Sequence, residues 1–184
     1  NAEDNEDNVE DSVEEVATSV IKVLTDVLAQ AFTLHNSGAF ADSGPVPPQA
    51  DQETTYTVMW SVSNSSGDVE NAMVTAVLPI YMEWNGLVSP SSDDVTYDSN
   101  SREITWDIGD LDAGIGYSGQ SRQSSFQLTL ISSASQVGTA PLLLNDTRFE
   151  GTHVFSGALI KRAMTNVNTF LQDGTGAIKR HEIV

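Results

Sequence analysis

The sequence contains three histidines and several neighbouring carboxylates, the residue types from which many catalytic sites are built. The histidines are His35, His153 and His181. None lies in a G-x-S-x-G or H-E-x-x-H motif. Asp93 with Asp94, and Asp110 with Asp112, resemble a glycosidase pair in type, but they stand in turn-forming sequence, which favours solvated loop carboxylates. We therefore predict no catalytic residue and no enzymatic activity.

Calcium binding is the one cofactor hypothesis that the carboxylates support. Ca²⁺ takes about six to eight oxygen ligands, and loops of β-sandwiches can supply them. The candidate ligands form two groups: Asp107, Asp110 and Asp112, and Asp4, Asp7 and Asp11. No EF-hand loop is present in the sequence. Simple solvation of these charges is the alternative, and the sequence leaves both open.

Two triplets match the acceptor motif for N-glycosylation. They are Asn64-Ser65-Ser66 and Asn145-Asp146-Thr147. Because the chain is rich in Asn, Ser and Thr, such triplets also arise by chance. Asn64 and Asn145 are therefore candidate glycosylation sites only in a host that glycosylates asparagine.

Composition limits the classes of partner. The chain has 184 residues, 26 Asp and Glu against 8 Lys and Arg, and a net charge of −18. So acidic a protein is repelled by nucleic acid and by anionic membranes. The absence of cysteine excludes disulfides and thiolate metal sites. No apolar run is long enough for a membrane span, and the chain begins without Met, so we expect a processed product or a fragment with one domain and tails.

Alternation of apolar and polar residues with period two predicts an all-β chain. Tyr56, Val58, Trp60 and Val62 fall on one face of a strand, and residues 72–78 alternate in the same way. The alternation continues through residues 80–84 to a predicted tight turn at Asn85-Gly86. Further strands are predicted at residues 95–97, 104–108, 126–130, 142–144 and 151–160. Seven or more short strands favour an antiparallel β-sandwich.

The N-terminal region contains two conflicting patterns. Residues 1–15 carry eight carboxylates and are typical of a solvated leader. From Val9 to Val27, valines recur at heptad spacing, which indicates an amphipathic helix. Residues 16–34 are also rich in β-branched side chains, which favour a strand buried on both faces. We interpret this segment as a strand, and the helix stays the alternative.

Part of the sequence resembles a known family. The matching text is TYTVMWSVSNSSGDVENAMVTAVLP, WNG, VTYDSNSREITWDIGDLDAG and SFQLTLISS. It is similar to the conserved-repeat, immunoglobulin-like β-sandwich modules of bacterial and archaeal cell-surface proteins. The resemblance implies an extracellular structural module without catalytic residues, and it favours a strand at residues 20–34. Asp112 stands where the family more often has an apolar residue or proline, and residues 1–15 fall outside the pattern.

These observations lead to one architecture and two functions. We expect an acidic leader at residues 1–15, an immunoglobulin-like antiparallel β-sandwich at 16–163 and a C-terminal tail at 164–184. The apolar leading strand would complete an edge of a neighbouring copy, which gives a homopolymeric filament, sheath or surface layer. The exchanged residues would be Val16, Val20, Ile21, Val23 and Leu24. Pairing of this strand within its own sandwich is the simpler alternative.

A second function uses aromatic side chains instead of strand exchange. Trp84, Tyr81 and Tyr117 could stack on sugars in an adhesin or glycan-binding module, although the alternation of Trp84 with Ile80 and Met82 favours a core position. An accessory domain of a larger secreted protein is the third alternative. A binding module would need no association with copies of itself.

Overall fold

The computed structural model describes residues 26–173 and 182–184. It contains nine β-strands and a three-residue 3-10 helix. The strands are β1 (Val27–Leu34), β2 (Glu53–Asn64), β3 (Val69–Val77), β4 (Met82–Ser89), β5 (Asp94–Asp98), β6 (Glu103–Leu111), β7 (Arg122–Ile131), β8 (Asn145–His153) and β9 (Leu159–Ala163), and the helix is η1 (Ala134–Gln136). No helix among the described residues has the length and apolar character needed to cross a bilayer.

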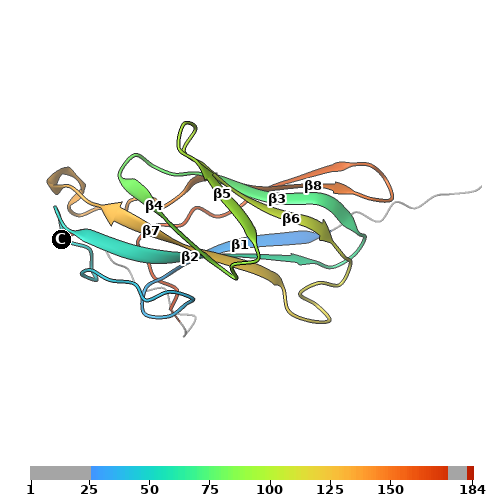
Figure 1. Cartoon of the computed structure of the whole chain (residues 1–184), viewed down its shortest axis with the longest axis horizontal. Helices are drawn as coiled ribbons and strands as arrows, with labels where there is room; N and C mark the ends of the chain where they lie inside the picture. Colours follow the sequence, from blue (N-terminus) through green and yellow to red (C-terminus); the bar gives the residue numbers. More distant parts are fainter. Residues whose placement is uncertain (1–25, 174–181) are drawn as a thin grey trace, which may run out of the picture.

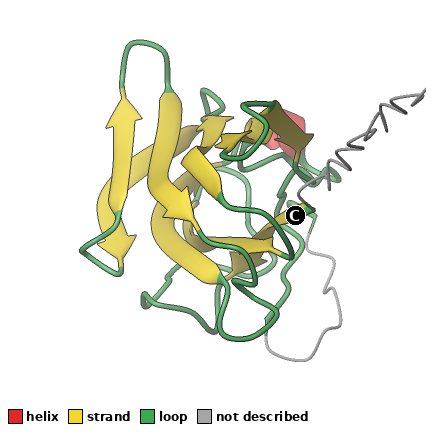
Figure 2. Cartoon of the chain, turned by 90° about the vertical axis from the view of Figure 1, so that its right-hand side faces the viewer, coloured by secondary structure: helices red, strands yellow, loops and turns green. Residues whose placement is uncertain are grey.

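The strands form two antiparallel sheets that pack face to face (Figures 1 and 2). The first sheet has the order β1-β2-β7-β4 and the second β5-β6-β3-β8-β9. Apart from the β5–β6 hairpin, these orders match the A-B-E-D and C-F-G sheets of a constant-type immunoglobulin domain. The predicted all-β, immunoglobulin-like fold is confirmed, and the hairpin extends its second sheet by two strands.

The core follows from the period-two pattern. Alternate residues of β2, from Tyr56 to Val62, are fully buried between the sheets, and so are the predicted inward residues of β3 and β7. At the centre, the Trp60 ring lies 6.5 Å from Trp106 and 4.7 Å from Phe126, measured between ring centroids. Burial of each large apolar side chain contributes about 1.5–3 kcal/mol, so the two sheets are held together mainly by these inward faces.

The region between β3 and β4 differs from its prediction. Ile80 does not continue an inward face: its side chain is 89% exposed in a turn that begins after Val77. Arg102 fixes this turn because its guanidinium donates hydrogen bonds to the backbone oxygens of Leu78, Pro79 and Met82 at 2.9, 2.7 and 2.6 Å. A long-range contact therefore overrides the local alternation.

Asn85-Gly86 is not a hairpin turn but part of an irregularity inside β4. The register of β4 against β7 shifts between Trp84 and Val88, and Gly86 has a φ of 74°. The Asn85 amide donates to Gln127 at 3.0 Å and accepts from Thr129 at 2.8 Å. These bonds to β7 stabilise a β-bulge, for which Asn-Gly is as suitable as for a turn.

Two other predicted strands have different limits. Leu143 and Leu144 are buried, but residues 142–144 form only an isolated bridge, from Leu142 to Asn168. The strand predicted at 151–160 consists of the end of β8, a turn and the start of β9. Apolar content indicated the burial of Leu143 and Leu144, but in the second segment Phe155 and Leu159 are exposed in and beside the turn.

The segment expected to be a C-terminal tail is part of the fold. Met164, Val167 and Leu171 are 7%, 4% and 0% exposed and belong to the core, and Ile183 is 1% exposed. The backbone of Leu143 donates to Val167, and that of Gly138 to Ile183, both at 2.8–2.9 Å. The sandwich thus extends beyond its predicted end at residue 163, because this segment packs along the side of the first sheet.

The described part of the leading strand is β1, which pairs with β2 of the same chain from Val27 to Leu34. A strand was predicted here, and for residues 27–34 that prediction is confirmed. Residues 1–25, with the rest of the valine pattern and the acidic leader, lie outside the described residues.

The packing of the C-terminal segment gives a prediction about stability. Leu171→Ala should lower the free energy of unfolding by about 2–5 kcal/mol, because it leaves a cavity in the core. Leu159→Ala is a matched control, since Leu159 is 61% exposed, and it should change stability by about 0.5 kcal/mol or less. Urea unfolding monitored by tryptophan fluorescence measures both variants. Equal stabilities would mean that the segment is a loose tail.

Candidate functional site

Four strands form the edges of the two sheets, and three of them are protected. Edge strands expose unpaired backbone groups and are usually blunted by charges, bulges or shortness. The bulge between Trp84 and Val88 interrupts β4. β5 has five residues and an aspartate at each end, and β9 carries Lys161 and Arg162. Each of these edges resists pairing with another chain.

β1 has none of these protections. Its sequence, VLAQAFTL, contains no charge, no proline and no glycine, and all eight residues pair with β2 in continuous register. It lies at the edge of the first sheet, and among residues 26–173 and 182–184 no further strand pairs with its outer side. Of the four edges, β1 is therefore the one to which another strand can add with least opposition.

The outward backbone groups of β1 can be identified from one contact. The Thr33 N–H donates to Gln172 Oε1 at 3.0 Å, and the Gln172 N–H donates to the Thr33 oxygen at 2.9 Å. Thr33 thus faces away from β2. In an antiparallel strand, the backbone N–H and C=O groups of alternate residues point to the same neighbour. The backbone groups of Val27, Ala29 and Ala31 therefore also point outward, away from β2. Within residues 26–173 and 182–184, no hydrogen-bond partner is found for these three residues on that side.

A groove runs beside this edge. Its volume is about 290 Å³, one wall is β1, and the other is the segment that follows β9. The lining residues are Ala29, Gln30, Ala31, Phe32 and Thr33 on β1, and Thr165, Asn166, Val167, Asn168, Phe170 and Gln172 opposite. The alanines keep the β1 wall low, so the space beside the strand can accept larger side chains. We call this site the β1 groove.

One end of the β1 groove is closed by a set of hydrogen bonds that we call the clasp. It consists of the two hydrogen bonds between Gln172 and Thr33 and of four hydrogen bonds that the Asp173 carboxylate accepts. The donors are the backbone N–H groups of His35 and Asn36, both at 3.1 Å, Asn36 Nδ2 at 2.7 Å and Ser37 Oγ at 3.0 Å. Partial burial by itself would raise the pKa of Asp173, but the hydrogen bonds from Asn36, His35 and Ser37 outweigh it and lower the pKa.

The predicted donor strand and the β1 groove come from neighbouring parts of the sequence. Val16, Val20, Ile21, Val23 and Leu24 all lie outside the described residues. The acceptor edge itself, with Ala29 and Ala31, was not singled out from the sequence. A signal for it exists, because no charged residue occurs from residue 27 to 41. The clasp had no sequence signal, since its parts are more than 130 residues apart.

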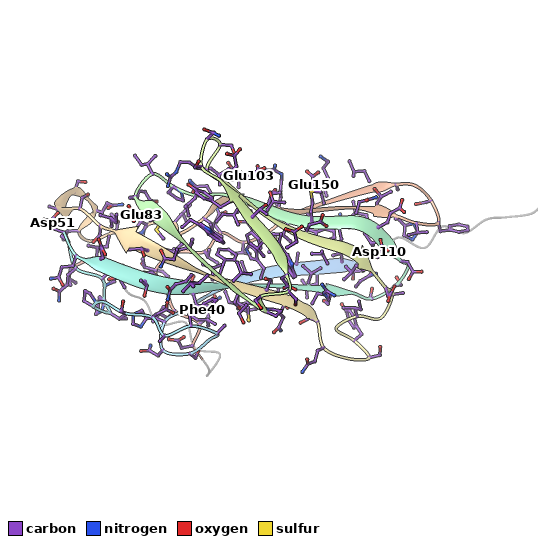
Figure 3. The ribbon with its side chains drawn as sticks, in the orientation of Figure 1. Phe40, Asp51, Glu83, Glu103, Asp110 and Glu150 are labelled. Carbon is purple, nitrogen blue, oxygen red and sulfur yellow. The ribbon has the colours of Figure 1, made fainter. Side chains whose placement is uncertain are left out.

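The predicted calcium ligands are not gathered into a site. In the described part of the chain, no group of three or more His, Asp or Glu side chains is placed to hold a metal ion. Asp107 instead accepts a hydrogen bond from the Gly109 N–H at 3.0 Å, and Asp110 and Asp112 are exposed. The labelled carboxylates in Figure 3 are spread along the sandwich. Asp4, Asp7 and Asp11 lie outside the described residues.

Asn64 is unsuitable as a glycosylation site in the folded protein, which corrects the prediction from the sequence. Its side chain is fully buried, and Nδ2 donates to the backbone oxygens of Gly67, Leu111 and Asp112 at 2.7, 3.2 and 3.3 Å. The same amide that would carry a glycan thus ties the β2–β3 turn to β6. Asn145 is partly exposed at the start of β8, and its glycosylation stays a prediction.

The histidines have separate environments. The His35 ring packs edge-on against Tyr56, with 5.9 Å between centroids. His153 is buried, and its Nδ1 lies 2.7 Å from Ser156 Oγ. His181 is outside the described residues.

Two of the three aromatic candidates for sugar stacking are engaged inside the fold. Trp84 is partly buried, stacks on Tyr97 at 5.8 Å and packs against Phe126. The Tyr81 hydroxyl donates to the Leu142 oxygen at 3.0 Å. Tyr117 is 59% exposed in the loop between β6 and β7. The three side chains therefore do not form a common stacking surface.

Comparisons with known proteins add little to this geometry. No protein family and no curated protein matches the sequence. Among solved structures, the major pilin subunit of Bacillus cereus is 10% identical with a TM-score of 0.47, over 78% of this chain and 39% of that one. The full-length major pilin of Corynebacterium diphtheriae is 12% identical with a TM-score of 0.46, over 78% and 35%.

An exo-β-N-acetylglucosaminidase of Vibrio harveyi is 14% identical with a TM-score of 0.38, over 74% of this chain and 17% of the enzyme. This chain thus spans well under half of the length of each of these proteins. Likenesses of this size do not transfer a function, and membership of the conserved-repeat family stays a prediction.

The clasp gives a prediction about pH. Asp173→Asn should lower the free energy of unfolding by about 1–3 kcal/mol at pH 7, because a neutral amide accepts fewer and weaker hydrogen bonds. Since folding lowers the pKa of Asp173, its contribution is complete above about pH 4, the ordinary carboxylate pKa, and is lost as the pH falls through the folded-state value. Urea titrations from pH 7 to pH 2 should therefore show the two proteins converging in acid.

Asp110→Asn serves as the control for this experiment, because Asp110 is an exposed aspartate. It should change the free energy of unfolding by about 0.5 kcal/mol or less at pH 7. A constant difference between wild type and D173N down to pH 2 would contradict the role given to the Asp173 carboxylate.

Proposed function

We propose that this chain is a structural subunit, or one repeat, of an extracellular surface assembly such as a filament, sheath or surface layer. Copies are joined by β-strand exchange: the stretch Val16–Leu24 of one copy adds to the β1 groove of the next. The observation that carries the proposal is the edge of β1, which is uncharged and unbulged and has three outward residues unpaired within the described chain.

The chemistry of the β1 groove suits an extended apolar peptide. Addition of a strand supplies backbone hydrogen bonds for affinity, and alternate side chains in pockets supply specificity. Ala29 and Ala31 leave room beside β1, and the half-buried Phe170 is among the residues that line the opposite wall. In Val16–Leu24, β-branched and leucine side chains recur on both faces of the strand, as a segment buried on both sides requires.

Magnitudes explain why the donor must be apolar. Ordering nine residues costs about 9–18 kcal/mol in backbone entropy. Six backbone hydrogen bonds, two for each of Val27, Ala29 and Ala31, contribute about 3–9 kcal/mol. Burial of the Val, Ile and Leu side chains, at about 1.5–3 kcal/mol each, must supply the remainder. A polar leader of the same length would therefore not stay in the groove.

The contact has a direction, which supports an open assembly. The donor of each copy precedes β1 and the acceptor is β1 itself, so every copy offers both halves of one heterologous joint. Such a joint generates rings or filaments according to its rotation. The composition suits a secreted protein, with three lysines, no cysteine and abundant Ser, Thr, Asn and Asp.

Proline substitution tests the acceptor edge without disturbing the sandwich. Ala31→Pro removes an N–H that faces the β1 groove and leaves the β1–β2 hydrogen bonds intact, so it should abolish polymerisation of a folded monomer. Ala163→Pro is the matched control. The N–H of its neighbour Met164 points toward β8 and donates to the Thr147 oxygen, so the Ala163 N–H points outward from β9. This variant should assemble like the wild type. Sedimentation velocity and electron microscopy measure assembly, and circular dichroism checks folding.

Deletion of residues 1–24 tests the donor. The truncated chain should stay folded and monomeric, and a synthetic peptide of residues 12–25 should bind it. Polymerisation of the truncated chain, or normal polymerisation of A31P, would refute strand exchange. A wild-type chain that stays monomeric at all concentrations, with the truncated chain binding the peptide, would mean that the segment pairs with its own β1.

A further inference from the structure

One end of the sandwich carries a cluster of exposed apolar side chains. We call this end the knob pole. The turn after β8 contributes Val154, Phe155 and Leu159, which are 53%, 73% and 61% exposed, and Leu28 on β1 is 48% exposed. Two backbone hydrogen bonds join these segments through the β2–β3 turn. The Val154 N–H donates to the oxygen of Asp68, at one end of the turn. The Ser65 N–H, at the other end, donates to the oxygen of Asp26, which precedes β1. In Figure 1 the β8 turn forms one extremity of the long axis.

The other end carries a second apolar cluster, which we call the flat pole. Its exposed side chains come from the β3–β4 turn, the end of β7, the loop after η1 and the last residue: Ile80, Ile131, Val137 and Val184, at 89%, 39%, 52% and 61% exposed. The backbone of Ile131 donates to Tyr81, and that of Ala50 to Val184, so these segments are neighbours. The chain end marks this extremity in Figure 1.

We infer that the knob pole of one copy docks on the flat pole of the next, so that the sandwiches stack along their long axis. The occupant of each pole is thus a second copy of this chain. This stack covers both apolar clusters at once, whereas pairing of like poles would cover only one. Four side chains at each pole make a small contact, which becomes stable only in combination with a second joint.

The start of the donor segment supports this order, and to that extent the inference rests on the proposed function. Asp26 lies at the knob pole, where its oxygen accepts the Ser65 N–H at 3.1 Å. Leu24 is two residues away, a span of at most about 7 Å. The acceptor copy must therefore sit directly on the knob pole. No long linker is available to reach a copy placed elsewhere.

Stacking also fixes the direction of the donor. β1 runs from the knob pole to the end where the clasp lies, since Val27 is near Asp26 and Leu34 precedes His35. A donor that arrives from the flat pole of the acceptor therefore lies parallel to β1, with Leu24 nearest the clasp. It meets the Gln172–Thr33 pair before it reaches Ala31, so these two hydrogen bonds are the contact that it has to displace.

Introduced cysteines test the stack, because the chain has no cysteine of its own. Phe155→Cys marks the knob pole and Val137→Cys the flat pole. With a short bismaleimide, the full-length F155C/V137C double variant should give a ladder of covalently linked multimers on a denaturing gel. Each single variant should give no covalent multimers. The reaction is run in about 1 M salt, where the screening length falls to about 3 Å and repulsion between the acidic copies is suppressed.

Each outcome decides a separate point. Dimers from F155C alone would mean that knob poles pair with each other, and polymers that give no ladder would mean that the poles do not meet; either overturns the inference while strand exchange stands. A ladder formed by the double variant carrying A31P would support the stack and remove its dependence on strand exchange.

Phe155→Ser should raise the concentration needed for assembly about ten-fold or more. Leu87→Ser, at a 46% exposed leucine on β4, should not change it.

Discussion

A sandwich of two open sheets has four strand edges, and the outward N–H and C=O groups of each must be paired or solvated. This constraint explains features that otherwise look unrelated. The bulge at Asn85-Gly86, the aspartates at the ends of β5 and the cations of β9 each make one edge a poor template. β1 is treated differently, because a segment from the far end of the chain lies beside it and leaves a groove. The asymmetry between this edge and the other three gives the molecule a direction.

The same C-terminal segment links the edge to the core. Val167 and Leu171 bury their side chains between the sheets, while Asn168 and Gln172 bond to Thr33 on β1. Neighbouring residues thus serve the interior and the edge, so apolar packing fixes the position of the groove wall. Opening of these polar contacts would leave the packing of Val167 and Leu171 in place, as the proposed strand exchange requires.

Period-two patterning was sufficient to predict the all-β fold and most of the core. Tyr56 to Val62 and Phe126 to Leu130 lie inward as predicted, because a strand between two sheets must alternate. Predictions failed where a distant residue determines the local structure. Arg102 holds Ile80 in a turn. Gln127 and Thr129 bond to Asn85 and convert Asn85-Gly86 into a bulge. Asn64 is held in a buried position by hydrogen bonds to three backbone oxygens. The prediction of a tail at residues 164–173 was wrong for the same reason. Their composition is like that of a tail, and their structure depends on contacts with β1.

The clasp has a consequence for when copies can associate. Under the proposed strand exchange, its hydrogen bonds occupy part of the recipient edge, and a neighbouring copy would have to replace them. Exchange of two such bonds for a longer ladder has a barrier but a favourable end point. In that case a single chain would keep these bonds closed until it meets the donor strand of another copy.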